Sequence, residues 1–286
     1  MGSRVPAAAG RLLGNVRAWR HSLSLVLSAA LVGCGGPGKP AAPAERPLPF
    51  LGAVVSPEQV AGGVAREVLA EGGNAADAAV ALGFALAVSL PSRAGLGGGG
   101  ACLAYEPSSS GPDHGRPEAI LFLPTAAAGG PVGDRPAAVP MLARGLYLLH
   151  ARYGRVPVQQ LVGAAQKMAR LGIHTSAPLV ADIAAVGEPL LADPAARAVF
   201  AGPSGMPLET GEILVQPDLA NTLSELRLNG LNDFYQGPLA RRIALAATAA
   251  GGGLTAADFA HAVPSLANPI ELRAGINRVA FLPAPA

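Results

Sequence analysis

Aromatic and charged side chains are both scarce in this 286-residue chain. Phe, Trp and Tyr together make up 4% of the residues, and Asp, Glu, Lys and Arg make up 14%, although half of the residues are hydrophobic. Proteins that bind nucleic acid usually carry a basic patch with aromatic side chains set among the basic ones. No stretch of this chain has that composition, so we expect no nucleic-acid partner.

Motifs for cofactors and metals are lacking as well. The five histidines have no metal-ligand spacing, and there is no Gly-Lys-Ser/Thr phosphate loop and no Gly-x-Ser-x-Gly nucleophile turn. Residues 95–100 match Gly-x-Gly-x-x-Gly, but in dinucleotide-binding proteins that pattern follows a strand and opens a helix. Here a helix is expected before it and a strand after it. The sequence therefore predicts no cofactor and no metal, and residue types alone assign no catalytic residue.

Only two cysteines occur, and the first ends a targeting segment. Residues 1–33 carry four arginines and an apolar run over 22–33 that is too short to span a bilayer. The run ends in Leu-Val-Gly before Cys34, which resembles a bacterial lipobox, where the cysteine is lipidated and becomes the new N-terminus. We predict a lipoprotein signal peptide over 1–33 with Cys34 as the lipid anchor. An ordinary signal peptide with an incidental cysteine is the alternative.

Cleavage after residue 33 would change the charge and the location of the chain. Removing four arginines from the 21 basic residues leaves 17 against 19 acidic ones, a formal charge of −2, so the overall pI of about 8.7 describes only the precursor. Residues 34–49 are rich in Gly, Pro and Ala and predict a flexible tether. We expect a folded domain over 50–286 that is lipid-anchored in the bacterial cell envelope, on the periplasmic or outer-membrane side.

The second cysteine, Cys102, follows four glycines and enters an apolar segment. With Cys34 lipidated it has no partner for a disulfide within the chain. We predict a small buried side chain here rather than a nucleophile.

The folded part is predicted to be α+β. Ser56 and Pro57 give a helix start, with Ser56 as the N-cap. Asn74 is predicted to cap the next helix with Asp77 in its first turn, and residues 78–90 are apolar on nearly every face, which predicts a buried helix. Helices are also expected within residues 57–71, 141–151, 158–171, 177–186, 195–200, 219–226 and 238–250, with a last turn around Asp258. Strands are expected over 51–55, 101–106 and 119–122 and within 269–283.

Several segments together resemble the gamma-glutamyltransferase (gamma-glutamyltranspeptidase) family. The most specific are Gly-Gly-Asn-Ala-Ala-Asp-Ala-Ala-Val at 72–80 and Gly-Leu-Gly-Gly-Gly-Gly at 95–100. Weaker segments follow in the family's order, and the similarity covers about residues 50–286. These segments are Val139-Pro140, Arg152-Tyr153-Gly154-Arg155, Gln216-Pro217-Asp218-Leu219-Ala220, Phe234-Tyr235-x-Gly237 and Gly252-Gly253-Leu254-Thr255-x-x-Asp258.

The resemblance implies an N-terminal-nucleophile hydrolase-like fold of αββα layers. It also implies a precursor that cleaves itself into a large and a small chain. A threonine at the start of the small chain attacks gamma-glutamyl amides such as glutathione, with its own amino group as base. On the large chain, the resemblance implies that Gly97, Gly98 and Gly99 line one wall of the substrate site.

Two departures from the family limit this expectation. The sequence ends at Ala286, before the segments that carry the threonine and its cleavage site, so the 50–286 domain is expected to be an incomplete, large-chain portion. In the family an arginine that holds the substrate carboxylate stands where this chain has Leu123, and leucine cannot make that contact. Arg93 is a candidate replacement cation, and a solvated loop arginine is the alternative.

Three functions remain open from the sequence. The first is the large-chain half of a transferase with a separately encoded small chain. The second is a non-catalytic lipoprotein with a binding or structural role in the envelope, and the third is a truncated fragment. Alone, the chain is expected to be inactive and to expose sheet edges that promote aggregation or partner binding.

Overall fold

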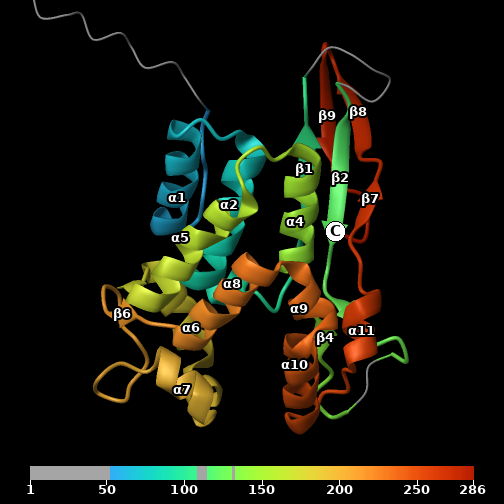
Figure 1. Cartoon of the computed structure of the whole chain (residues 1–286). Helices are drawn as coiled ribbons and strands as arrows, with labels where there is room; N and C mark the ends of the chain where they lie inside the picture. The colour runs from blue at the N-terminus through green and yellow to red at the C-terminus, as the bar shows by residue number, and fades with distance from the viewer. Residues whose placement is uncertain (1–51, 108–114, 131–132) are drawn as a thin grey trace, which may run out of the picture. The chain divides into compact units, whose positions relative to one another are not determined.

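The computed structural model describes residues 52–107, 115–130 and 133–286. The signal peptide, the tether and Cys34 lie outside the described residues, so the predictions about them remain predictions. Within the part that is described, helices predominate (Figure 1). They are α1 (Gln59–Ala70), α2 (Ala75–Ser89), α3 (Pro91–Ala94), α4 (Leu142–Tyr153), α5 (Val158–Leu171), α6 (Ala177–Ala192), α7 (Pro194–Phe200), α8 (Pro217–Asn229), α9 (Leu231–Gln236), α10 (Pro238–Ala249) and α11 (Ala256–His261).

The strands form small antiparallel sheets. They are β1 (Gly100–Tyr105), β2 (Pro117–Phe122), β3 (Thr125–Ala126), β4 (Ala138–Val139), β5 (Ile173–His174), β6 (Ile213–Leu214), β7 (Ser265–Ala267), β8 (Ile270–Ala274) and β9 (Asn277–Phe281). The largest sheet has the order β1-β2-β7, and β3-β4, β5-β6 and β8-β9 are two-stranded. Helices and sheet are thus mixed, and the α+β prediction is confirmed.

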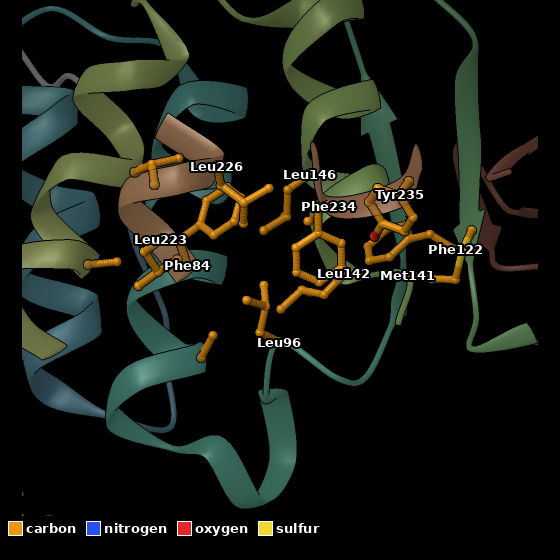
Figure 2. Packing of buried hydrophobic residues seen from close by; sticks show 14 of the residues in the cluster. Phe84, Leu96, Phe122, Met141, Leu142, Leu146, Leu223, Leu226, Phe234 and Tyr235 are labelled. Atoms are coloured by element: carbon orange, nitrogen blue, oxygen red, sulfur yellow. The ribbon is translucent and has the colours of Figure 1, made fainter. Parts of the chain in front are cut away.

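Helix α2 lies at the centre of the helical layer, as its all-round apolar sequence predicts. It packs against α1, α4 and α5, and Phe84 on it is fully buried (Figure 2). Asn74 caps this helix as predicted, because Asn74 Oδ1 accepts from Asp77 N at 2.9 Å. Asp77 Oδ2 in turn accepts from Asn74 N at 3.0 Å, which completes a capping box. The other Asp77 oxygen accepts from the backbone N–H groups of Arg155 and Val156, so one buried carboxylate joins α2 to the α4–α5 turn.

The strands expected over 101–106 and 119–122 are present as β1 and β2 and form an antiparallel hairpin, with Gly100 opposite Phe122 and Tyr105 opposite Pro117. Strand β7 pairs with the other edge of β2. Helix α4 packs on β2 and buries Ile120 and Phe122 in the main core. This places the C-terminal end of β2 beside the N-terminus of α4.

The β8–β9 hairpin confirms the strands expected within 269–283, and it is the least buried sheet. All five β8 residues are exposed, and the β9 residues are exposed except for half-buried Ala280. Its apolar side chains Leu272 and Phe281 remain about half accessible to solvent. A two-stranded ribbon without a covered face is marginally stable by itself.

Three local predictions are wrong. Residues 52–55 form no strand, because no neighbouring strand pairs with them. Ser56 does not cap α1: the Glu58 side chain reaches the N–H groups of Val60 and Ala61 instead, so the helix begins at Gln59. Helix α6 continues past Val186 to Ala192, and Pro189 lies within its last turn.

A second, smaller core lies under α6 and α7. Leu90, Leu179, Ile183, Leu208 and Leu214 are buried together there, apart from the main cluster. Leu90 is the residue directly after α2, so this core joins α6 to the segment that leads into the glycine-rich turn of residues 95–99.

Candidate functional site

The glycine-rich turn positions the first turn of α4. The carbonyl oxygen of Gly98 accepts from the backbone N–H groups of Met141 at 2.7 Å and of Leu142 at 3.0 Å. The first N–H groups of a helix have no partner within the helix. Gly98 supplies that partner, and the turn and α4 are thereby held together.

Gly99 allows the same turn to approach the end of β2. A Cβ atom at Gly99 would overlap the carbonyl oxygen of Phe122 and lie 3.0 Å from the backbone nitrogen of Pro124. Gly145 on α4 is required for a similar reason, because a Cβ there would overlap the Phe122 ring. Turn, strand end and helix start therefore meet around Phe122.

Gly97 differs from its neighbours, because a Cβ there would meet nothing within 4 Å. It is exposed on the turn, whereas Gly98 and Gly99 are half-buried. Packing therefore explains the glycine at 99 and leaves the one at 97 unexplained. A role of Gly97, Gly98 and Gly99 in substrate binding remains a prediction.

The residues that follow Phe122 are apolar. Leu123 is half-buried and Pro124 is exposed, and neither can donate a hydrogen bond from its side chain. The position that the resemblance gives to a carboxylate-binding arginine thus offers no cation from β2 itself.

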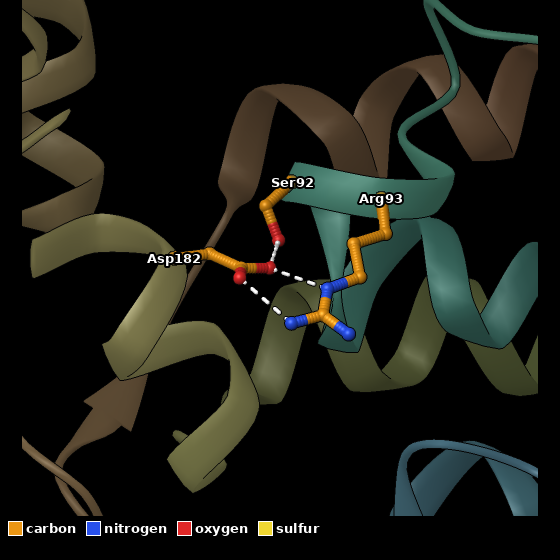
Figure 3. A network of polar contacts seen from close by, with 3 residues as sticks. All are labelled: Ser92, Arg93 and Asp182. Atoms are coloured by element: carbon orange, nitrogen blue, oxygen red, sulfur yellow. Dashed lines mark hydrogen bonds and ion pairs between the residues drawn. The ribbon is translucent and has the colours of Figure 1, made fainter. Parts of the chain in front are cut away.

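Arg93, the candidate replacement, is paired with Asp182 on α6 (Figure 3). Its Nε donates to Asp182 Oδ2 at 2.7 Å, its Nη2 donates to Oδ1 at 2.8 Å, and the Ser92 hydroxyl donates to Oδ2 at 2.7 Å. These hydrogen bonds, first that of Arg93, lower the pKa of Asp182 to about 2. A substrate carboxylate would have to compete with Asp182 for Arg93, whose role in binding stays a prediction.

The sequence analysis missed Arg144, which is buried on α4. It is 9% exposed, and its guanidinium carbon lies 4.0 Å from the centre of the Tyr235 ring. Its Nη1 donates to the Ala260 carbonyl at 3.5 Å, and its side chain makes no other hydrogen bond to the described residues. A charge flanked by the buried residues 142, 143, 145 and 146 is the sequence signal that would have pointed to it.

Cys102 lines a groove of about 650 Å³ between β1 and the N-terminus of α2, together with Ala76, Ala79 and Arg155. The thiol is half-buried, and burial raises its pKa. A raised pKa lowers the thiolate fraction, and the thiolate is the nucleophilic form. The groove favours the structural interpretation of Cys102.

Residues 52–107, 115–130 and 133–286 contain no group of three or more His, Cys, Asp or Glu side chains placed to hold a metal ion. In this same part of the chain, no helix is both long and apolar enough to cross a membrane.

Comparison with known proteins decides the family. The sequence model described as gamma-glutamyltranspeptidase matches residues 61–286. The chain belongs to the gamma-glutamyltranspeptidase family. Among its relatives, the glutathione hydrolase proenzyme of Escherichia coli (strain K12) is 33% identical over 228 residues, which cover 73% of this chain and 38% of that protein. The glutathione hydrolase proenzyme of Bacillus subtilis (strain 168) is 32% identical over 237 residues, which cover 77% of this chain and 39% of that protein.

Solved structures confirm the N-terminal-nucleophile hydrolase-like fold of the family. Helicobacter pylori gamma-glutamyltranspeptidase matches with a TM-score of 0.74 at 27% identity, covering 82% of this chain and 71% of that one. The gamma-glutamyltranspeptidase of Pseudomonas nitroreducens complexed with L-DON gives 0.71 at 28% identity, covering 82% of this chain and 72% of that one. The chain spans about two fifths of the length of the curated relatives that it matches.

Proposed function

We propose that this chain is the large-chain half of a gamma-glutamyl transferase or hydrolase that works with a separately encoded small chain. The observation that carries the proposal is the family match over residues 61–286, combined with coverage of about two fifths of each curated relative. The substrate class is gamma-glutamyl amides such as glutathione. The wall of the substrate site that this chain supplies would be the turn at 97–99, beside the end of β2.

The β8–β9 hairpin favours a partner chain that adds strands to it. Leu272 and Phe281 are exposed on strands that have no third strand beside them in the part of the chain that the structure describes. A small chain that adds strands would bury these side chains and pair the open backbone edges.

The chain alone is proposed to be inactive. Leu123 cannot hold a carboxylate, and the resemblance assigns the nucleophile to a small-chain threonine. Hydrolysis would need that threonine, its amino group and the oxyanion donors to be brought to the turn by the partner. Cys34 is proposed to anchor the assembly at the bacterial envelope, which would place it where extracytoplasmic gamma-glutamyl compounds are met.

The test is release of p-nitroaniline from gamma-glutamyl-p-nitroanilide. We expect none from the full chain alone and measurable release when it is co-expressed with a small chain encoded by the reading frame just downstream, provided that frame contains a Thr-Thr-His-like segment. Release by the chain alone would overturn the proposed division of roles. A downstream frame without such a segment would count against the two-chain proposal.

A non-catalytic envelope lipoprotein is the second candidate, and the replacement at Leu123 favours it. It predicts that the co-expressed complex forms without releasing the chromophore. A truncated fragment predicts instead that no complex forms and that the full chain aggregates.

A further inference from the structure

A cleft of about 280 Å³ lies between α5 and α8, which pack side by side (Figure 1). Three of the side chains that line it are cations, Lys167 and Arg170 on α5 and Arg227 on α8, and the other lining residues are neutral. Helix α5 contains no Asp or Glu at all. Positive charge is therefore gathered at this cleft without an acidic side chain in its walls.

None of the three cations is paired with a carboxylate in the described part of the chain. The four ion pairs found there involve other residues. Arg170 Nη2 donates to Asn221 Oδ1 at 2.8 Å, which orients the side chain without neutralising it. Arg227 makes no side-chain hydrogen bond to the described residues, and its Nε is buried without an acceptor. A buried donor without a partner is uncommon in proteins, and a bound ion is one explanation for it.

The ends of the two helices explain only part of this arrangement. Arg170 and Arg227 lie in the last turns of α5 and α8, where a cation interacts favourably with the free carbonyl groups. That interaction does not require side chains from two helices to line the same cleft, and Lys167 lies outside the last turn. Like charges that are brought together repel one another. An anion in the cleft would remove this repulsion.

Arg227 is positioned for binding by its contact with α5. A Cβ atom at Gly163 would lie 3.9 Å from Arg227 Cδ, so the aliphatic part of the arginine runs beside α5 at this glycine. The Nη groups of Arg227 are not buried, and they can be reached from the cleft that the residue lines. A side chain that is already held in place loses less conformational freedom when it binds a ligand.

We propose that the α5–α8 cleft is a binding site for a phosphate group, whose oxygens are contacted by Arg227, Arg170 and Lys167. The guanidinium fork of arginine binds phosphate through two parallel hydrogen bonds, and lysine adds a point charge. Sites that enclose a whole ligand measure roughly 300–1,000 Å³. This cleft of about 280 Å³ is smaller, so it would hold the charged group and leave the rest of the ligand outside.

A lipid headgroup is the source of phosphate that the surroundings favour. Leu171 lines the same cleft and is 77% exposed. Basic side chains next to an exposed apolar one are typical of faces that contact anionic membranes. The lipid source rests on the proposed anchoring at Cys34, whereas the binding of a phosphate group does not rest on the proposed function.

The first experiment measures binding of glycerol 3-phosphate to the full chain by calorimetry at constant ionic strength, with glycerol as the neutral analogue. We expect glycerol 3-phosphate to bind and glycerol not to bind. Arg227→Gln should weaken binding at least about tenfold, because hydrogen bonds to a charged group are lost, and Arg170→Gln should also weaken it. Arg66→Gln is the control, because Arg66 is an exposed arginine on α1 and its loss changes the net charge equally.

The second experiment measures cosedimentation of the full chain with vesicles of phosphatidylcholine, with and without about one fifth phosphatidylglycerol. Residues 1–33 are the same in every variant, so differences between variants report on the cleft. We expect phosphatidylglycerol to increase binding, and Arg170→Gln and Lys167→Gln each to reduce the increase roughly fivefold. Arg66→Gln should keep the increase. Leu171→Ser should weaken binding to vesicles and leave binding of glycerol 3-phosphate unchanged.

Binding of vesicles alone, lost in the cleft variants, identifies the lipid headgroup. Binding of glycerol 3-phosphate alone supports the phosphate site and overturns the lipid source. The proposal is overturned if neither glycerol 3-phosphate nor phosphatidylglycerol is bound, if the cleft variants bind as the wild type does, or if Arg66→Gln loses as much binding as they do. If Arg227→Gln does not fold, the exposed positions Arg170 and Lys167 decide. Chromophore release with a small chain succeeds or fails independently of both results.

Discussion

The Arg93 guanidinium and the Asp182 carboxylate form a bidentate ion pair between residues that are 89 positions apart in the sequence. Arg93 lies in α3, directly before the glycine-rich turn, and Asp182 lies in α6 above the smaller core. The pair therefore links the approach to the turn with a separate part of the fold. Arg93 is 55% exposed at its side chain, so water and salt weaken the link.

Replacing Arg93 should change the titration of Asp182. The pKa of Asp182 lies at about 2 instead of its usual 3.8, so the pair stabilises the fold above pH 4 and this contribution is lost as the pH falls through 2. In Arg93→Ala we expect the pKa of Asp182 to rise towards 3.8, stopping short because Ser92 still donates. Carboxyl ¹³C NMR over pH 1.5–6 measures it, with Arg197→Ala as the control.

The same variant tests the predicted role of Arg93 in binding a substrate carboxylate. If Arg93 holds a substrate carboxylate, Arg93→Ala should weaken gamma-glutamyl binding in the presence of a small chain. We expect binding to be unchanged, because Asp182 occupies the guanidinium. An Asp182 pKa that stays at about 2 in Arg93→Ala would contradict the structural account.

Gly99→Ala should destabilise the fold, whereas Gly97→Ala should not. A methyl group at 99 would meet the carbonyl oxygen of Phe122, and strand and turn would have to move apart at a cost of about 1–3 kcal/mol. At 97 the methyl group meets open space, and we expect a change within about 0.5 kcal/mol. Urea unfolding of both variants measures the difference. Equal stabilities would show that the turn does not need its close approach to β2.

Local signals in the sequence predicted what depends on neighbours within a few residues. The cap of α2 is an example, because the Asn74 side chain accepts from the N–H of Asp77, three positions away. At Ser56 the same kind of reasoning was wrong, because Glu58 caps the helix two residues later, where its side chain accepts from the N–H groups of Val60 and Ala61. Where several cap residues compete, side-chain reach decides between them.

Long-range pairings could not be predicted in this way. Arg93 meets Asp182 from 89 positions away, and Arg144 meets Tyr235 and Ala260 from 91 and 116 positions away. No periodicity or spacing encodes those distances. The family resemblance gave no indication of a cation on α4.

Asp77→Ala should be among the most damaging single changes on α2. Three backbone N–H groups, those of Asn74, Arg155 and Val156, would lose their acceptor, at about 1 kcal/mol each. Asp218→Ala is the matched control, because Asp218 also lies in the first turn of a helix but is exposed, and its loss should cost about 0.3–1 kcal/mol. Chemical unfolding compares the two. A loss below 1 kcal/mol for Asp77→Ala would contradict the bridging role.

Cys102 should react slowly with Ellman's reagent in the native chain. Burial raises the pKa of the thiol and limits access to it, so the thiolate fraction at pH 7 is small. Denaturation should increase the rate. Cys102→Ala should leave chromophore release by a complex with a small chain unchanged. A loss of release in a variant that still folds and assembles would assign the thiol a catalytic role.

The β8–β9 hairpin should exchange its amide hydrogens faster than β1 and β2 in the chain alone. Nearly all of its residues are exposed, so opening it exposes little additional apolar surface. Binding of a small chain should slow exchange there and leave β1–β2 nearly unchanged. Hydrogen–deuterium exchange with mass spectrometry follows both segments. A hairpin already as protected as β1–β2 in a monodisperse monomer would contradict the need for a partner.

Leu272→Lys separates partner binding from folding at the same hairpin. Leu272 is 57% exposed, so the charge should change the stability of the chain alone by no more than about 0.5 kcal/mol. At an interface the same lysine would be buried against strands of the partner, and a buried unpaired ammonium is strongly unfavourable. We therefore expect complex formation to weaken at least tenfold by sedimentation velocity. Leu228→Lys on α8 is the control, because Leu228 is an exposed leucine outside the hairpin. If both variants weaken the complex equally, the hairpin is not the docking surface.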